Sequence, residues 1–206
     1  MDTALVEFKP GDALSTVILA GGLGTRIGGD KGLQLLRGKA LIDWVLDRIS
    51  KQSDEVLINA NTNQNEYAKR GYRVIADQLP DWAGPLAGLQ TALRNAQHDW
   101  VASVPCDTPF LPDNLIARLG TAINATTDAA VAVTEGQRQP TIALYRKSVL
   151  PKLDTYLGSG KRKVGDWLNT LRVSEVVFED AAAFANINSL DELLIANQRT
   201  TANLKR

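Results

Sequence analysis

Short apolar runs alternate with longer segments of helical period along the chain. The short runs are rich in β-branched residues, which favours strands. The predicted strands cover 15–20, 55–60, 72–76, 100–106, 129–135, 140–146 and 173–179. Continuous apolar character is typical of strands covered on both faces. We therefore expect the first and fourth of these strands to be the most fully buried.

The longer segments carry apolar residues on one helical face. Leucine, isoleucine and valine recur at spacings of three and four from residue 41 to residue 49, which predicts a helix there. Similar patterns predict helices over 84–97, 112–124, 148–159, 164–171 and 189–199. Ser189 and Glu192 have the spacing of a capping box, so the last of these helices is expected to begin at Ser189.

This alternation predicts an α/β fold, Rossmann-like, with a mostly parallel sheet and helices on both faces. The order is interrupted at 129–146, where two strand-like runs flank the sequence GQRQ. We expect an antiparallel flap or insertion there. Ligands bind at the carboxyl ends of strands in open sheets of this kind, so residues near 20, 60, 77 and 107 should share one crevice.

Length and composition place the chain in an ordinary class. Its 206 residues suit one domain over 15–206, preceded by a loose extension over 1–14. The formal net charge is zero, which gives no support for a nucleic-acid partner. No apolar stretch has the length of a membrane span or a signal peptide. Cys106 is the single cysteine, which excludes an internal disulfide and favours the cytoplasm.

Glycines are concentrated in the sequence LAGGLGTRIGGDKG, residues 19–32, directly after a predicted strand. Ile27 stands where a dinucleotide-binding loop needs its third glycine, and Gly32 stands where a Walker A loop needs serine or threonine. What remains is a glycine-rich loop with two cations, Arg26 and Lys31, suited to phosphate oxygens. A flexible loop with two solvated cations is the alternative.

Polar residues follow three of the predicted strands. Asp107 comes directly after the strand at 100–106, and a carboxylate beside bound phosphate groups suits Mg²⁺. Asn59 and Asp77 stand where the second and third strands end, so both can offer hydrogen-bonding groups to a ligand in the crevice. The alternative for each of the three is a turn or capping role.

The sequence offers no convincing general base or nucleophile. His98 lies at the end of a predicted helix, away from the strand ends, and is expected at the surface. Cys106 has no partner base and is expected to be a packed side chain. A reaction whose nucleophile is already anionic at neutral pH, such as a phosphate monoester, would need no such base. Positioning and charge neutralisation would then carry the catalysis.

Several motifs together resemble one enzyme family. The glycine-rich loop is followed by GPLAGLQTAL (84–93), CDTPFLP (106–112), QPTIALY (139–145) and NINSLDEL (186–193). In order and spacing they resemble the molybdenum cofactor guanylyltransferases of the nucleoside-triphosphate transferase superfamily. The resemblance extends from about Ser15 to about Gln198.

The resemblance implies a nucleotide-diphospho-sugar transferase fold, GTP and Mo-bound molybdopterin as substrates, and Mg²⁺ as cofactor. GMP would pass to the terminal phosphate of molybdopterin, with release of pyrophosphate. Molybdoenzymes or other cofactor-biosynthesis proteins would be partners. The implied catalytic residues are Arg26, Lys31 and Asp107, with Asp107 on the metal. The implied binding residues are Leu19, Ala20, Gly21, Gly22, Lys31, Asn59, Asp77, Asp107, Asn186 and Asn188.

Some features leave alternatives open. Helix capping is an alternative role for Asn186 and Asn188. The basic turn at 158–165 is either a solvated surface or close to a second anionic substrate. Gln139 replaces a histidine that is common in the family. The competing functions are nucleotidyl transfer from CTP to molybdopterin, transfer to a sugar phosphate, and a non-catalytic nucleotide-binding module.

Overall fold

The computed structural model describes residues 8–9, 11–22, 29–78, 84–189 and 192–193. Within these residues a seven-stranded sheet has the order β5-β4-β1-β6-β8-β7-β9. The strands are β1 (Leu14–Leu19), β4 (Glu55–Asn59), β5 (Arg73–Ile75), β6 (Trp100–Pro105), β7 (Ala129–Thr134), β8 (Gln137–Arg146) and β9 (Val173–Val177). Every predicted strand is therefore confirmed to within a few residues.

Strand direction confirms the mostly parallel sheet. β1 pairs in parallel with β4 on one side and β6 on the other, and β4 pairs in parallel with β5. Within the seven-stranded sheet of the described residues, only β8 runs the other way, antiparallel to both β6 and β7. β1 and β6 are buried along almost their whole length, but β7 is buried throughout, so the expectation that the first and fourth strands would be the most fully buried is confirmed only in part.

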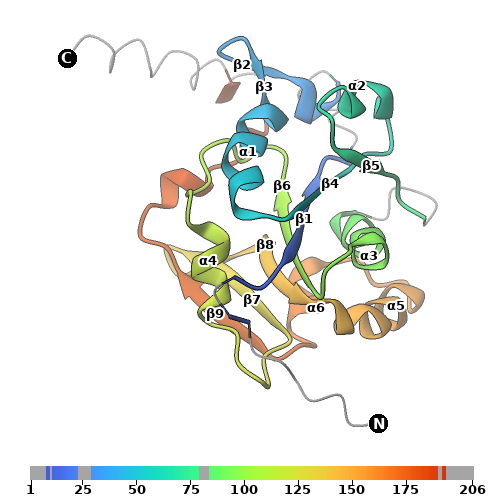
Figure 1. Cartoon of the computed structure of the whole chain (residues 1–206), viewed down its shortest axis with the longest axis vertical. Helices are drawn as coiled ribbons and strands as arrows, with labels where there is room; N and C mark the ends of the chain where they lie inside the picture. The colour runs from blue at the N-terminus through green and yellow to red at the C-terminus, as the bar shows by residue number, and fades with distance from the viewer. Residues whose placement is uncertain (1–7, 10, 23–28, 79–83, 190–191, 194–206) are drawn as a thin grey trace.

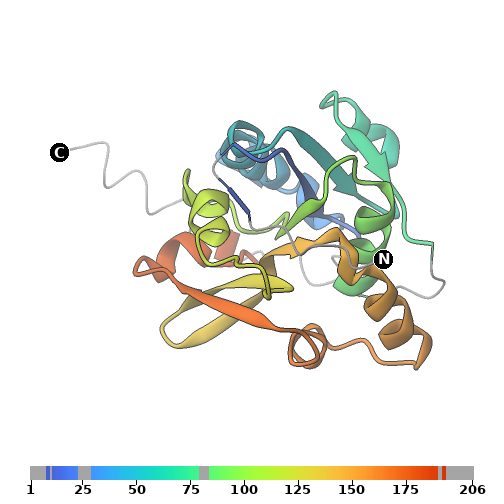
Figure 2. The same ribbon diagram turned by 60° about the horizontal axis from the view of Figure 1, so that its bottom comes forward.

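The interruption at 129–146 is an antiparallel hairpin, but it is not a flap. Glu135 and Gly136 both have positive φ, 50° and 72°, which fits the tight two-residue turn between Thr134 and Gln137. β8 then enters the sheet between β6 and β7, and Figure 2 shows the hairpin beside β9. The reason is burial, because the apolar end of β8 over 142–145 has to be covered on both sides.

Helices cover both faces of the sheet, as predicted (Figure 1). α1 (Leu41–Ile49) and α4 (Leu115–Gly120) pack on one face, in a core cluster that includes Ile18. α3 (Pro85–Asn95), α5 (Leu150–Gly158) and α6 (Val164–Leu168) pack on the other face, in a cluster that includes Val17. Neighbouring residues of β1 thus face opposite layers.

Some short elements have no clear sequence pattern. They are α2 (Gln64–Ala68), the β2–β3 ribbon (Leu35–Leu36 and Lys39–Ala40), and the 3₁₀ turns η2 (Lys31–Leu33), η3 (Ser50–Gln52), η4 (Lys147–Val149) and η5 (Ala181–Phe184). α2 buries only Tyr67, so it shows no apolar period. α4 is shorter than predicted, covering six residues of the range 112–124.

The two ends of the domain differ in part from expectation. β1 begins at Leu14, one residue before the predicted domain boundary, and the Phe8 ring packs edge-on against Trp100. Ser189 Oγ accepts from the backbone N–H of Glu192 at 3.1 Å, the first half of the predicted cap. Glu192 Oε2 accepts from the N–H of Asn188 instead of Ser189. The remainder of 189–199, apart from Leu193, lies outside the described residues.

No described helix combines the length and apolar character needed to cross a membrane.

Candidate active site

A cavity of about 340 Å³ opens at the carboxyl ends of β1, β4 and β6. The backbone ladder continues past the strands there, since Ala20 N–H donates to Asn59 O at 2.8 Å and Cys106 N–H donates to Leu19 O at 3.1 Å. The cavity is lined by Leu19, Ala20, Gly21, Gly22, Lys31, Asn59, Asp77, Gly84, Pro85, Pro105, Cys106, Asp107 and Thr141. The predicted crevice is therefore present where the strands end.

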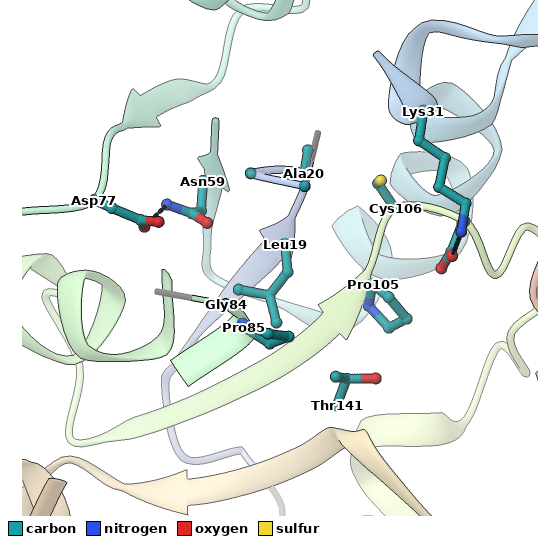
Figure 3. Close-up of a pocket in the computed structure, with 13 residues that line it drawn as sticks. Leu19, Ala20, Lys31, Asn59, Asp77, Gly84, Pro85, Pro105, Cys106 and Thr141 are labelled. Carbon is teal, nitrogen blue, oxygen red and sulfur yellow. Dashed lines mark hydrogen bonds and ion pairs between the residues drawn. The ribbon is translucent and has the colours of Figure 1, made fainter. Parts of the chain in front are cut away.

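Asp77 and Asn59 lie at one end of this cavity and Lys31 lies at the other, with Leu19 and Ala20 between them (Figure 3). The cavity thus has a carboxylate at one end and, at the other, an ammonium group paired with the Asp107 carboxylate. A nucleotide has a hydrogen-bonding base at one end and an anionic phosphate chain at the other. The two ends of the cavity match those two chemistries.

Two asparagines hold the Asp77 carboxylate in place. Asn59 Nδ2 donates to Asp77 Oδ1 at 2.8 Å, and Asn61 Nδ2 donates to Asp77 Oδ2 at 2.9 Å. Asn61 Oδ1 in turn accepts from the Asp77 backbone N–H at 2.9 Å. Asn59 is 2% exposed, so its amide supports Asp77 more than it faces the cavity. Each carboxylate oxygen keeps a further lone pair for a ligand.

Gly88 in α3 allows this arrangement to pack. A Cβ at Gly88 would overlap the Asn59 amide oxygen and would lie 2.8 Å from Leu19 Cδ2. Both neighbours belong to the cavity wall, and the Asn59 amide cannot withdraw because it is bonded to Asp77. The close approach of α3 to β1 and β4 therefore requires glycine at this position.

Gly88→Ala is expected to destabilise the protein by about 1–3 kcal/mol, because overpacking a filled core displaces side chains. The displacement of Asn59 and Leu19 should also weaken GTP binding. Thermal unfolding and calorimetric titration with GTP measure the two effects. Gly158→Ala is the control, since a Cβ there meets nothing within 4 Å. Equal stability of the two variants would contradict the packing argument.

At the other end, Lys31 joins residues from distant parts of the chain. Its Nζ donates to Asp107 Oδ2 and, at 2.7 Å, to Asn188 Oδ1. Asp107 is 7% exposed. Its second oxygen, Oδ1, is buried and accepts no hydrogen bond from any residue in the described part of the chain. A buried carboxylate oxygen without a partner is unfavourable unless a ligand satisfies it.

The segment around Ile187 brings both predicted asparagines beside Asp107. Ile187 is buried, and its N–H donates to Asp107 O at 2.9 Å. Asn186 Oδ1 accepts from Thr108 Oγ1 at 2.8 Å, while Asn188 contacts Lys31. Both exposed amides therefore flank the Asp107 region, although neither lines the cavity itself.

Asp107 Oδ1 gives the site one oxygen suited to a hard cation. Mg²⁺ commonly takes one or two protein carboxylates and fills its other positions with phosphate oxygens and water. No group of three or more His, Cys, Asp or Glu side chains gathers for a metal among the described residues. The donor set therefore fits a metal that arrives with a phosphate ligand, and it does not form a complete protein cage.

Cys106 and His98 take the roles predicted for them. Burial raises the pKa of the Cys106 thiol well above its ordinary value, with Asp107 adding to the effect, so the thiol stays protonated. His98 is half-buried and so lies only partly at the surface, and it does not line the cavity. Neither side chain is suited to act as a nucleophile or base at this site.

The remaining sequence candidates lie apart from the cavity or outside the described residues. Gln139 Nε2 donates to Thr134 Oγ1 at 2.7 Å, a contact within the β7–β8 hairpin. In the basic turn, Arg162 donates to the carbonyl of Leu157 at 2.8 Å, which caps the end of α5. Neither residue lines the cavity. Arg26 lies outside the residues that the structure describes.

Sequence reasoning missed other residues of the site: Asn61, Gly84, Pro85, Pro105 and Thr141. Asn61 had a signal, because it follows the second strand two residues after Asn59. Gly84 and Pro85 belong to the quoted GPLAG motif, and Gly84 has the positive φ, 79°, that precedes α3. Thr141 had no such signal, since only the position of β8 in the sheet brings it to the cavity.

A family model described as the MobA-like NTP transferase domain matches residues 16–175, which include Asp77 and the Lys31–Asp107 pair. The chain belongs to this family. It is 47% identical over 190 residues to the molybdenum cofactor guanylyltransferase of Cupriavidus metallidurans. That alignment covers 88% of this chain and 93% of the relative. It is 45% identical to that of Burkholderia ambifaria, over 93% and 98% of the two chains.

A solved structure shares the MobA-like fold. The crystal structure of molybdopterin-guanine dinucleotide biosynthesis protein A from Archaeoglobus fulgidus is 26% identical, with a TM-score of 0.73. The similarity covers 91% of this chain and 99% of the other. The predicted fold class and the predicted family are therefore both confirmed. The family match ends at residue 175, so Asn186 and Asn188 lie beyond it.

Proposed function

We propose that this protein is a molybdenum cofactor guanylyltransferase, which transfers GMP from GTP to the terminal phosphate of Mo-bound molybdopterin and releases pyrophosphate. Membership of the MobA-like family and the names of its relatives support this assignment. The observation that carries it is the polarity of the cavity, with Asp77 at one end and the Lys31–Asp107 pair at the other. The names of these relatives, both guanylyltransferases, do not favour transfer from CTP or transfer to a sugar phosphate.

The transfer forms one phosphorus–oxygen bond and breaks another. A phosphate oxygen of molybdopterin attacks the α-phosphorus of GTP, and the bond from that phosphorus to the bridging oxygen breaks, so that pyrophosphate leaves with the electron pair. The nucleophile is already anionic at neutral pH, so no side chain has to remove a proton from it. The Cys106 thiol in the cavity wall stays protonated and is not needed as a base. The work of the protein is to align the two phosphates and neutralise charge.

Lys31 is the residue proposed to meet the phosphates of GTP. It bonds to Asp107 and Asn188, two polar side chains on separate segments, so its ammonium group is held at the cavity end. Three donors on one ammonium can be shared between these oxygens and a phosphate. Its positive charge would stabilise the phosphates of bound GTP and also the negative charge that develops on the leaving pyrophosphate. Arg26 is proposed to assist there, as the resemblance implies.

Asp107 is the residue proposed to hold Mg²⁺, through the Oδ1 atom that lacks a partner among the described residues. When bound, the metal would neutralise phosphate charge and act as a Lewis acid on the transferring group. Asn186 and Asn188 are proposed to contact the reacting phosphates from the same side. Leu19, Ala20, Gly21 and Gly22 are proposed to lie against the nucleotide, because all four line the cavity.

The cytoplasm is the proposed location, supported by a single cysteine that permits no internal disulfide. Enzymes that receive the finished cofactor are the proposed protein partners.

A pyrophosphate-release assay with GTP, ATP, CTP and UTP tests the proposed function. Each nucleotide is supplied with Mg²⁺, with and without Mo-loaded molybdopterin. We expect release with GTP only, and only when molybdopterin is present. Preference for CTP would assign a cytidylyltransferase, and release with a sugar phosphate in place of molybdopterin would assign another branch of the superfamily. Absence of release with every pair of substrates would leave a binding module.

Asp77→Ala is expected to reduce discrimination between GTP and other nucleotides. The loss of a carboxylate acceptor leaves guanine donors unpaired, which costs GTP about 1–3 kcal/mol, and ATP or CTP less. Competition between nucleotides at fixed Mg²⁺ measures the preference of each protein. Gln78→Ala is the control, because it changes the exposed neighbour of Asp77 and keeps the Asp77 carboxylate with both of its asparagine contacts. A uniform loss for all nucleotides would assign Asp77 to ribose, metal or structure.

A further inference from the structure

The loop that carries Lys31 has an anchor that the catalytic assignment leaves unexplained. We infer that Asp30 is a positioning residue, whose carboxylate, bound by Tyr67, sets the place of Lys31 in the site. The inference rests on the proposed function, and it concerns a contact outside the set of cavity-lining residues. Asp30 itself is not among the residues that line the cavity.

Asp30 accepts three hydrogen bonds from one short segment. Tyr67 Oη donates to Asp30 Oδ1. Thr62 Oγ1 donates to Oδ2 at 3.3 Å, and Asn63 Nδ2 donates to the same oxygen at 3.2 Å. The donors lie in the turn after β4 and in α2. The residue immediately before Lys31 is therefore tied to a separate segment of the chain, more than 30 residues away.

Tyr67 is a fixed donor. It is fully buried, and burial raises the pKa of its hydroxyl far above the ordinary value, so that the hydroxyl keeps its proton. Its ring is covered by Arg70, whose guanidinium lies 5.8 Å from the ring centroid and pairs with Asp43 of α1. A buried, packed hydroxyl holds Asp30 in one position better than a surface side chain does.

Gly32, the residue after Lys31, packs closely against the same tyrosine. A Cβ at Gly32 would lie 2.5 Å from Tyr67 Oη and 3.2 Å from its ring. Because the ring has no room to move, glycine is needed there if the hydroxyl is to reach Asp30. The residues on both sides of Lys31 thus contact Tyr67, which explains the order Asp-Lys-Gly in physical terms.

The supporting segment serves both ends of the cavity. It begins at Asn61, which holds Asp77, and it ends at Tyr67, which holds Asp30. A lysine side chain has several rotatable bonds, so its ammonium group is placed well only if its backbone is fixed. A displacement of about 1 Å at a reacting centre can lower the rate by about 100-fold. The loss of Asp30 as an anchor should therefore act through Lys31.

A double-mutant cycle on the full chain tests this inference. Asp30→Asn and Tyr67→Phe are made in the wild type and in Lys31→Ala, and kcat, KM for GTP and calorimetric GTP affinity are measured. In the wild type we expect kcat to fall about 10- to 100-fold. In Lys31→Ala the same changes should cost less than about threefold, because residues that act through one another are not additive.

Glu66→Gln is the matched control, because it changes an exposed ion pair with Lys69 on the same helix, α2, and the Glu66 carboxylate makes no described bond to Tyr67 or Asp30. We expect it to change kcat by less than about twofold, as for a site without shared partners. Thermal unfolding of each variant reports folding. Tyr67→Phe keeps the buried ring, so it carries the test if Asp30→Asn does not fold.

Equal losses in both backgrounds would show that Asp30 acts independently of Lys31 and would overturn the inference. Unchanged kcat and GTP affinity in Tyr67→Phe and Asp30→Asn would overturn it as well. If the wild type transfers no GMP, the proposed function fails, but GTP affinity still completes the cycle. A loss of affinity that disappears in Lys31→Ala would then support the positioning role on its own.

Discussion

Asp107→Asn is expected to lower kcat by about 100- to 1,000-fold while the fold is retained. The size of the side chain is preserved, but the anionic oxygen that lacks a partner in the described structure is replaced by a neutral group. Removal of one well-placed electrostatic element typically has an effect of this size. Single-turnover GMP transfer over a range of Mg²⁺ concentrations measures it.

The matched control is Asp113→Asn, in the loop that follows Asp107. Asp113 pairs with Arg48 at 2.9 Å in an exposed ion pair, which should contribute little to stability and nothing to transfer. Thermal unfolding of both variants separates a folding defect from a catalytic one. Turnover near the wild-type rate for Asp107→Asn at saturating Mg²⁺ would remove Asp107 from the metal site.

Lys31→Ala is expected to weaken GTP binding and slow transfer together. A charge-assisted hydrogen bond contributes about 1.5–3 kcal/mol, which corresponds to roughly 10-fold or more in the dissociation constant of GTP. The rate constant should fall further, by about 100-fold, because negative charge accumulates on the leaving pyrophosphate. Calorimetry with GTP and single-turnover transfer give the two quantities separately.

Lys39→Ala is the control for this variant. Lys39 pairs with Asp47 and lies over the Trp44 ring, in the β2–β3 ribbon and away from the cavity. It should leave both quantities within about twofold of the wild type, since exposed pairs contribute little. Unchanged GTP affinity together with unchanged transfer in Lys31→Ala would contradict the phosphate role of the loop at 19–32.

Asp77 and Asn61 illustrate the limit of prediction from the sequence at the site. The end of the third strand predicted a polar residue in the crevice, and Asp77 is there. The sequence did not predict that both of its oxygens are held by asparagines, because neither bond follows from a local pattern. Hydrogen bonds between side chains 16 and 18 residues apart depend on how β4 and β5 are paired.

Local patterns were sufficient for the fold class. Apolar periods of two residues predict strands, and periods of three to four residues predict helices, because each element depends on neighbours in the chain. The alternation of strands and helices then predicts parallel pairing. The same is true of the motifs that identified the family. α2 was not predicted, because Tyr67 is its one buried residue and the helix therefore has no apolar face that a periodic pattern could show.

The sequence by itself therefore determined the strands, the main helices, the fold class and the family, because these follow from local periodicity and from contiguous motifs. Only the tertiary structure decided that β8 enters the sheet between β6 and β7. It also decided that Lys31 meets Asp107 and Asn188, which are 76 and 157 residues away along the chain. Such contacts depend on the packing of whole layers, which no local stretch of sequence contains.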